Sequence, residues 1–155
     1  MTGAGAAAKA YGQPMLEISR NHWLEMLAEA WARYPLEACG LLMGPTGGDR
    51  VERFVPIHNE AESSRIYQLA GSEYARAVMA ADRDGLDIVG VVHTHTHTAA
   101  YPSVTDVAEA SKPLVPVNWH WVIISLGWGR PETHSYQIVD GGIVEEPVVL
   151  AQCNP

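Results

Sequence analysis

Two histidines and an aspartate carry the clearest potential for chemistry in this sequence of 155 residues. His93 and His95 are one residue apart at the end of an apolar stretch, and Asp106 follows after a short loop. Side chains at positions i and i+2 of a β-strand point to the same face, so the two imidazoles can face one point. Two imidazoles and a carboxylate that leave one position open form the ligand set of a catalytic zinc ion. These residues are therefore a candidate zinc site, of the kind that activates water.

Each part of this pattern also has a purely structural explanation. His93, His95 and His97 can be the solvated polar end of a strand or an adventitious metal-binding tract. Ser103, followed three residues later by Asp106, is close to a capping box at the start of a helix. The two explanations of Asp106 are compatible, because Ser103 can cap the helix while Asp106 faces a metal. The complete spacing, with seven residues between His95 and Ser103, is much rarer than its parts and favours a metal site.

Two elements must bring these side chains together. Residues 87–93 are apolar and β-branched, which predicts a buried strand that ends at the first histidine. Residues 103–112 have a helix-like pattern that is closed by Pro113. If the intervening loop folds this helix back over the end of the strand, Asp106 meets the two histidines.

The rest of the chain supplies further strands and helices around that pair. One helix is expected between its N-cap Ser19 and Pro35, and another over 73–83 with Ser72 as its cap. The order of all the elements predicts an α/β or α+β sandwich, with a mixed β-sheet flanked by helices. The other strand-like segments are 37–44, 50–58, 66–69, 119–126, 132–139 and 143–150.

Length and composition limit the class of protein. We expect one domain over residues 15–150, between a disordered Ala- and Gly-rich tail at 1–14 and a C-terminal tail at 151–155. The formal net charge of −8 counts against nucleic acid or an anionic membrane as partner. No apolar stretch approaches the ~20 residues of a membrane span. With only two cysteines a disulfide framework is excluded, and we expect a cytoplasmic protein.

The spacing of the candidate residues resembles a known signature. His93, His95, Ser103 and Asp106, with Glu37 upstream in an apolar segment, look like the motif of the JAMM (MPN-plus) zinc metalloproteases. The chain departs from that family at Thr94, where Ser is common, and at Thr96, where many relatives have Pro, but neither departure changes a ligand. The resemblance covers nearly all of the chain after the tail, and the segments most similar to small bacterial Mec-type peptidases are 50–59, 100–103, 135–141 and 145–148.

The resemblance implies a fold and a role for each residue. The fold would be that of the MPN/JAMM domains, which have a cytidine-deaminase-like core. One Zn²⁺ per chain would be held by His93, His95 and Asp106. Glu37 would be the general base and then the general acid, and its apolar neighbours favour a raised pKa. Ser103 would donate a hydrogen bond to the developing oxyanion or to the water.

The resemblance also implies a substrate. Mec-type peptidases process a small ubiquitin-like sulfur-carrier protein that ends in Gly-Gly, and they release cysteine from its C-terminus. The chain would therefore be a zinc metallopeptidase that trims residues after Gly-Gly or releases an attached cysteine, in sulfur transfer and in the biosynthesis of cysteine or thio-metabolites. A homodimer is compatible with this resemblance.

Several residues outside the metal ligands are candidate contacts with the substrate. An open strand edge at 65–69 can bind the tail of the carrier by β-augmentation, and Tyr67 lies on it. His97 and Tyr101 are further candidate substrate contacts, since they lie within the metal motif, between His95 and Ser103. Trp128, between two glycines of a turn, is a candidate for partner contact.

Three alternatives stay open at this point. The first is a non-catalytic MPN scaffold that only binds partners, although such relatives typically lack the ligands that are present here. The second is a zinc deaminase, which would use a Pro-Cys-x-x-Cys motif that this sequence does not contain. The third is nucleophilic catalysis by Cys39, for which the sequence identifies no partner.

Overall fold

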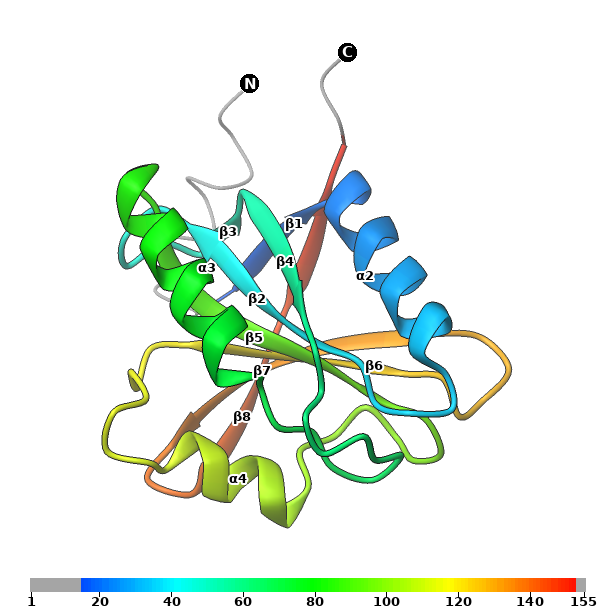
Figure 1. Ribbon diagram of the computed structural model, residues 1–155. Coiled ribbons are helices and arrows are strands. Elements are labelled where there is room, and N and C mark those ends of the chain that lie inside the picture. The colour runs from blue at the N-terminus through cyan, green and yellow to red at the C-terminus, as the bar shows by residue number, and fades with distance from the viewer. Residues whose placement is uncertain (1–14, 153–155) are drawn as a thin grey trace.

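The computed structural model describes residues 15–152, in which two β-sheets pack with three helices (Figure 1). The predicted tail at 1–14 lies outside the described residues, as does Cys153. No helix among the described residues is long and apolar enough to cross a lipid bilayer. The helices are α2 (Arg20–Arg33), α3 (Gly71–Arg83) and α4 (Val104–Ala110), and the strands are β1 (Leu16–Ser19), β2 (Cys39–Gly44), β3 (Arg50–Val51), β4 (Arg53–Ile57), β5 (Asp87–His95), β6 (His120–Ser125), β7 (Glu132–Val139), β8 (Gly142–Glu146) and β9 (Val148–Ala151).

The larger sheet has the strand order β4-β2-β5-β6-β7-β8, and the smaller sheet has the order β3-β1-β9. Within the larger sheet, β5 and β6 are parallel and the other neighbouring strands are antiparallel. The predicted mixed sheet is therefore confirmed. Because β5 lies between β2 and β6, the strand that carries both histidines is hydrogen-bonded along its two sides.

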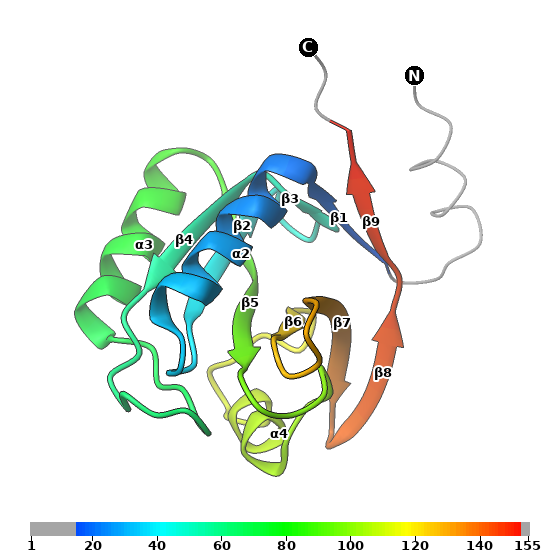
Figure 2. The same ribbon diagram turned by 90° about the vertical axis from the view of Figure 1, so that its right-hand side faces the viewer.

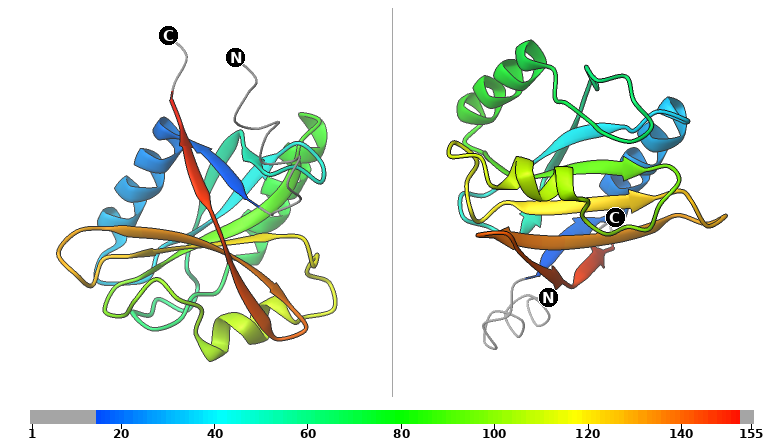
Figure 3. Two further views of the ribbon diagram at one scale, coloured as in Figure 1. Left: turned by 180° about the vertical axis from the view of Figure 1, so that it is seen from behind. Right: turned by 90° about the horizontal axis from the view of Figure 1, so that it is seen from below.

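Each face of the larger sheet has its own hydrophobic core. On one face, Ala77 and Ala81 of α3 are buried against the sheet, and Val107 of α4 packs at the margin. On the other face, Met26 and Ala30 of α2 pack together with the smaller sheet. Figure 3, in the view from below, shows α4 in front of the sheet and α2 behind it, and Figure 2 shows β1 and β3 beside the start of α2. The predicted sandwich with helices on its faces is thus confirmed.

Two segments that were each predicted as one strand are divided between the sheets. Residues 50–58 form β3, which pairs with β1, and then β4, which pairs with β2. Residues 143–150 likewise form β8 in the larger sheet and β9 in the smaller one. Pro147 lies at the second division, where it has no N–H to donate to a ladder. Its carbonyl oxygen instead accepts a hydrogen bond from Leu16 N at 2.9 Å.

The prediction of a strand over 66–69 was wrong, since only an isolated bridge joins Leu69 to Asn59. The reason is the side chain of Asn59, which takes the place of a neighbouring strand. Its Nδ2 donates to Ile66 O at 3.1 Å, and its Oδ1 accepts from Gln68 N at 2.9 Å. The prediction that Ser72 caps α3 was also wrong, because Ala70 is the N-cap residue and provides no side-chain bond.

Candidate active site

Three buried side chains converge where β5 meets the start of α4. His93 Nε2 and His95 Nε2 are 3.1 Å apart, and each is 3.2 Å from an oxygen of the Asp106 carboxylate. A tetrahedral zinc ion with Zn–N and Zn–O bonds of about 2.0–2.1 Å separates its ligand atoms by about 3.3 Å. The donor set and its spacing therefore fit a metal ion of this kind, held by the three residues that the sequence singled out.

The contacts of each imidazole fix its orientation. His95 Nδ1 donates to Ala99 O at 2.7 Å, which leaves the Nε2 lone pair directed at the metal position. The ring of Tyr67 stacks on the ring of His93, with 4.3 Å between the ring centroids. Tyr67 is buried, so the structure places it behind a metal ligand and not on the exposed substrate-binding edge that the sequence predicted.

Asp106 is oriented by the first turn of α4. Ser103 Oγ accepts a hydrogen bond from Asp106 N at 3.1 Å, and Asp106 Oδ2 accepts one from Ser103 N at 2.8 Å. This is a complete capping box, and the same carboxylate faces both histidines. Burial acts to raise the pKa of Asp106, but its close contacts with the His93 and His95 imidazoles outweigh burial and hold the pKa below its usual range. The Asp106 carboxylate is therefore charged at neutral pH, as a metal ligand would have to be.

Glu37 lies just before β2 and beside the metal position. Its N–H donates to Ser63 O at 2.8 Å, and its carbonyl oxygen accepts from Asn59 Nδ2 at 3.0 Å, so the backbone is held on both sides. Burial raises the pKa of Glu37 to about 7, against the lowering effect of His95 and with the help of Asp106. A carboxyl group with this pKa can accept a proton and return it near neutral pH.

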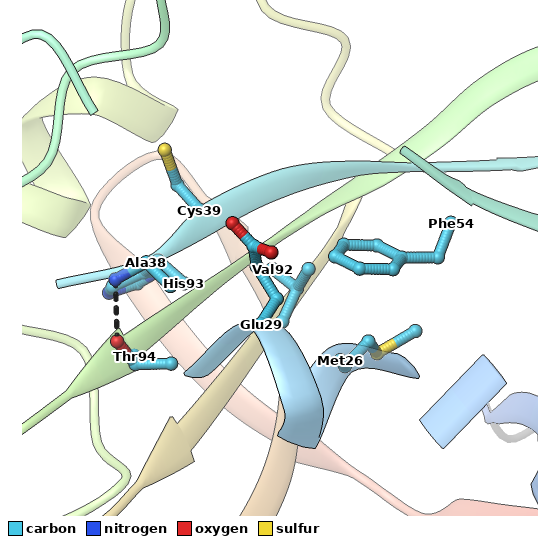
Figure 4. A pocket seen from close by; sticks show the side chains of 8 residues that line it. All are labelled: Met26, Glu29, Ala38, Cys39, Phe54, Val92, His93 and Thr94. Carbon is cyan, nitrogen blue, oxygen red and sulfur yellow. Dashed lines mark hydrogen bonds between the residues drawn. The ribbon is translucent and has the colours of Figure 1, made fainter. Parts of the chain in front are cut away.

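The side chain of Thr94 fixes the position of Glu37 relative to the histidines. Figure 4 shows the small cavity between α2 and the sheet, where Thr94 Oγ1 accepts a hydrogen bond from Ala38 N at 2.8 Å. Thr94 N also donates to Ala38 O at 3.0 Å. The residue between the two histidines is thus bonded twice to the residue after Glu37.

A cavity of about 650 Å³ adjoins the three convergent side chains and is lined by one of them, His95. Of the other predicted site residues, it brings Glu37, Ser103 and His97 together with His95. Tyr101 does not line this cavity. The residue is 56% exposed, and its ring contacts Tyr136 edge-on. The cavity is lined by Glu37, Ser64, Arg65, His95, His97, Thr98 and Ser103.

Sequence reasoning gave no role of their own to Ser64, Arg65 and Thr98, although all three line this cavity. No spacing links residues 64–65 to the metal motif, because they reach the site through the loop after β4. The only signal in the sequence that could have pointed to Arg65 was its charge, because an arginine side chain is suited to binding an anion.

Cys39 does not have the environment of a nucleophile. Its side chain is buried, and the thiol donates to Ile57 O at 3.3 Å. Burial raises the pKa of Cys39 to about 12, with a smaller contribution from the charge of Glu37. The thiol is therefore protonated at neutral pH, which argues against covalent catalysis by this residue.

Comparison with known proteins gives the same family as the motif. A family model described as prokaryotic homologs of the JAB domain matches residues 19–139. The chain is 43% identical over 129 residues to the CysO-cysteine peptidase of Mycobacterium tuberculosis, and the match covers 82% of this chain and 85% of the relative. It is 30% identical over 109 residues to a probable TtuB-protein conjugate cleaving protease of Thermus thermophilus, with 70% and 72% covered.

A solved structure supports the fold over almost the whole chain. A protein from Desulfitobacterium hafniense, known from its solution structure, superposes with a TM-score of 0.78 at 33% identity, over 90% of this chain and 94% of that one. The matches extend well beyond the residues of the motif, from β1 through β7. The chain therefore belongs to the prokaryotic JAB family, which confirms the resemblance to the JAMM metalloproteases.

Proposed function

We propose that this protein is a zinc metallopeptidase that hydrolyses the amide bond at the C-terminus of a ubiquitin-like sulfur-carrier protein. The observation that carries the proposal is the position of Glu37, which shares one cavity with His95 and Ser103. A buried carboxyl group beside two imidazoles and a second carboxylate is the arrangement that metal-assisted hydrolysis needs. The mycobacterial relative, a CysO-cysteine peptidase, supports the carrier as substrate.

The residues of the chain divide the reaction between them. His93, His95 and Asp106 would hold the zinc ion, which when bound supplies Lewis-acid chemistry toward a water molecule and a carbonyl group. Glu37 takes one proton from the attacking water, whose oxygen forms a bond to the carbonyl carbon. Glu37 then gives that proton to the leaving nitrogen as the C–N bond breaks. The second proton of the water also passes to the released nitrogen, so the products are a new C-terminal carboxylate on the carrier and an ammonium group on the released residue.

Ser103 contributes a hydroxyl group at the wall of the same cavity. Its Oγ already accepts a hydrogen bond from Asp106 N, which leaves the hydroxyl hydrogen for another acceptor. In the proposed reaction this hydrogen is donated to the oxygen that becomes negatively charged. A preorganised donor of this type contributes on the order of 3 kcal/mol to the stabilisation of the transition state.

The carrier is proposed to end in Gly-Gly, as the resemblance to the Mec-type peptidases implies. The cysteine or other residues after Gly-Gly are then the part that is released. A homodimer stays a prediction, and so does a cytoplasmic location.

Replacement of Glu37 by Gln tests the proposal. The variant keeps the shape of the side chain but cannot accept the proton, so we expect zinc content to be unchanged and turnover to fall by about 10²–10⁴-fold. Zinc is measured by elemental analysis, and cleavage by mass spectrometry of a Gly-Gly-ended carrier extended by one cysteine. A wild-type protein that binds zinc but leaves the carrier intact would favour the non-catalytic scaffold.

A further inference from the structure

Arg65 is the one lysine or arginine among the described residues that line the active-site cavity. Four other arginines, Arg33, Arg50, Arg53 and Arg83, are paired with carboxylates of the protein. Within residues 15–152, Arg65 has no carboxylate within ion-pair distance. Its positive charge is therefore free to meet an anion that enters the cavity.

The backbone of Arg65 is held firmly against the catalytic residues. Glu37 N donates to Ser63 O at 2.8 Å, and Arg65 N donates to Ser63 Oγ at 3.0 Å. On the other side, Thr96 Oγ1 donates to Ser64 O at 3.2 Å. The segment is thus bonded both to the proposed general base and to Thr96, which follows His95. Arg65 itself lines the cavity that contains Glu37.

We propose that Arg65 binds the free α-carboxylate of the residue that leaves, so that the enzyme acts on a single residue at the end of the carrier. In a C-terminal residue, the carboxylate and the scissile nitrogen are attached to the same Cα. Glu37 must reach that nitrogen, so the carboxylate enters the same cavity. A guanidinium group binds a carboxylate through two parallel hydrogen bonds. This inference rests on the proposed function and adds the recognition of the leaving group to it.

The proposal also separates two kinds of substrate. When a carrier is attached to the side chain of a lysine, the leaving nitrogen is an ε-amine without a carboxylate nearby. Arg65 then gains no partner from the leaving group. We therefore expect the enzyme to release a terminal amino acid faster than it cleaves a conjugate on lysine.

The test compares two forms of one substrate. The probe is a Gly-Gly-ended ubiquitin-like carrier extended by a single cysteine, prepared as the free acid and as the C-terminal amide. We expect wild-type kcat/KM to be about 10–100-fold higher for the free acid, since a hydrogen bond to a charged group contributes about 1.5–3 kcal/mol. Most of the difference should be in KM, because the contact is made before and during the reaction.

Arg65→Gln should reduce this preference toward one, and Arg65→Lys should keep part of it. Arg76→Gln, which removes the same charge from the exposed face of α3, should leave the wild-type preference intact. Calorimetry in the Glu37→Gln background gives the same comparison as a ratio of Kd values without turnover. If the wild type cleaves the acid and the amide equally well, or if Arg65→Gln retains the preference, the role of Arg65 is wrong and the proposed function stands. If neither form is cleaved by zinc-loaded enzyme, the proposed function itself is wrong.

Discussion

The Asp106 carboxylate both caps a helix and faces the two histidines. Its Oδ2 accepts the N–H of Ser103 and faces His95, while its Oδ1 faces His93. A capping aspartate is usually exposed at the start of its helix, whereas this one is 4% exposed. The helix cap therefore acts as the outer contact that orients a metal ligand. This explains why the motif places a serine three residues before its aspartate.

At the same scale, the environment of Cys39 predicts its reactivity. A thiol with a pKa of about 12 is protonated at pH 8, and burial keeps reagents away from it. We expect iodoacetamide to leave Cys39 unmodified in the native protein and to modify it after unfolding in urea, as measured by peptide mass spectrometry. Cys39→Ser, which keeps a donor toward Ile57 O, should retain activity. Loss of activity in that variant with an intact fold would revive a catalytic role for the thiol.

The metal motif could be predicted from the sequence because its parts are local. His93 and His95 share a face of one strand, and Ser103 and Asp106 share one helical turn. Glu37 was found only through the family resemblance, since nothing near it in the sequence indicates a catalytic role. Arg65 was predicted only as part of the 65–69 edge. Its place in the catalytic cavity was missed, because its segment is held there by hydrogen bonds of Ser63 and Ser64 to distant segments, which leave no pattern in the sequence.

Among the elements, β2 and β5 determine the catalytic geometry. They are antiparallel, with Cys39 opposite His93, and a register shift lies between Leu42 and Met43. The shift is far enough along the strands to leave the pairing next to the site regular. The distance between Glu37 and the histidines is thus set by the ladder at one end of β5 and by the bonds of Thr94 to Ala38.

The hydroxyl of Thr94 should therefore contribute to both stability and activity. In Thr94→Val the side chain keeps its volume, but the buried N–H of Ala38 loses its acceptor. We expect the free energy of unfolding to fall by about 1–3 kcal/mol. Turnover should fall as well, because Ala38 is bonded to Glu37. Urea unfolding and hydrolysis assays measure the two effects, and Thr94→Ser, which retains the hydroxyl, is the matched control. Equal stability of the Val and Ser variants would show that this bond contributes little.

At the scale of elements, sequence pattern predicts which segments are extended but not which sheet each strand joins. Alternation identified residues 50–58 and 143–150 as extended, and both are. It contains no information about which sheet each half joins, because that choice depends on β1, which pairs with β3 and β9. The prediction of a strand over 66–69 was wrong for a related reason. A single side chain, that of Asn59, forms hydrogen bonds with backbone groups that a neighbouring strand would otherwise satisfy.

In the molecule as a whole, the metal position lies between strand β5 and helix α4, which make few other contacts with each other. Two of the residues that would hold the metal belong to the central strand β5, and the third belongs to α4, a helix of seven residues. Isolated helices of this length are unstable in water, so α4 depends on tertiary contacts. Without a cation between them, two imidazoles and a carboxylate also remain desolvated in the interior. Binding of a metal should therefore stabilise the folded protein as a unit.

This linkage predicts that zinc raises the melting temperature of the protein in a concentration-dependent way. A ligand at 100 times its Kd stabilises the folded state by about 2.7 kcal/mol. For a chain of this size that corresponds to an increase in Tm of about 5–10 °C. Chelation by EDTA should reverse the increase in Tm, which differential scanning calorimetry measures. It should also abolish hydrolysis, which mass spectrometry of the carrier measures. The Asp106→Asn variant should lose most of the zinc-dependent increase in Tm. The Glu37→Gln variant should keep this increase, because Glu37 is proposed to act in the reaction and not to hold the metal. If zinc stabilised the Asp106→Asn variant as strongly as the wild type, the metal would have to bind elsewhere. The Asp106 carboxylate lies 3.2 Å from both imidazoles, and no other described acidic residue belongs to that group.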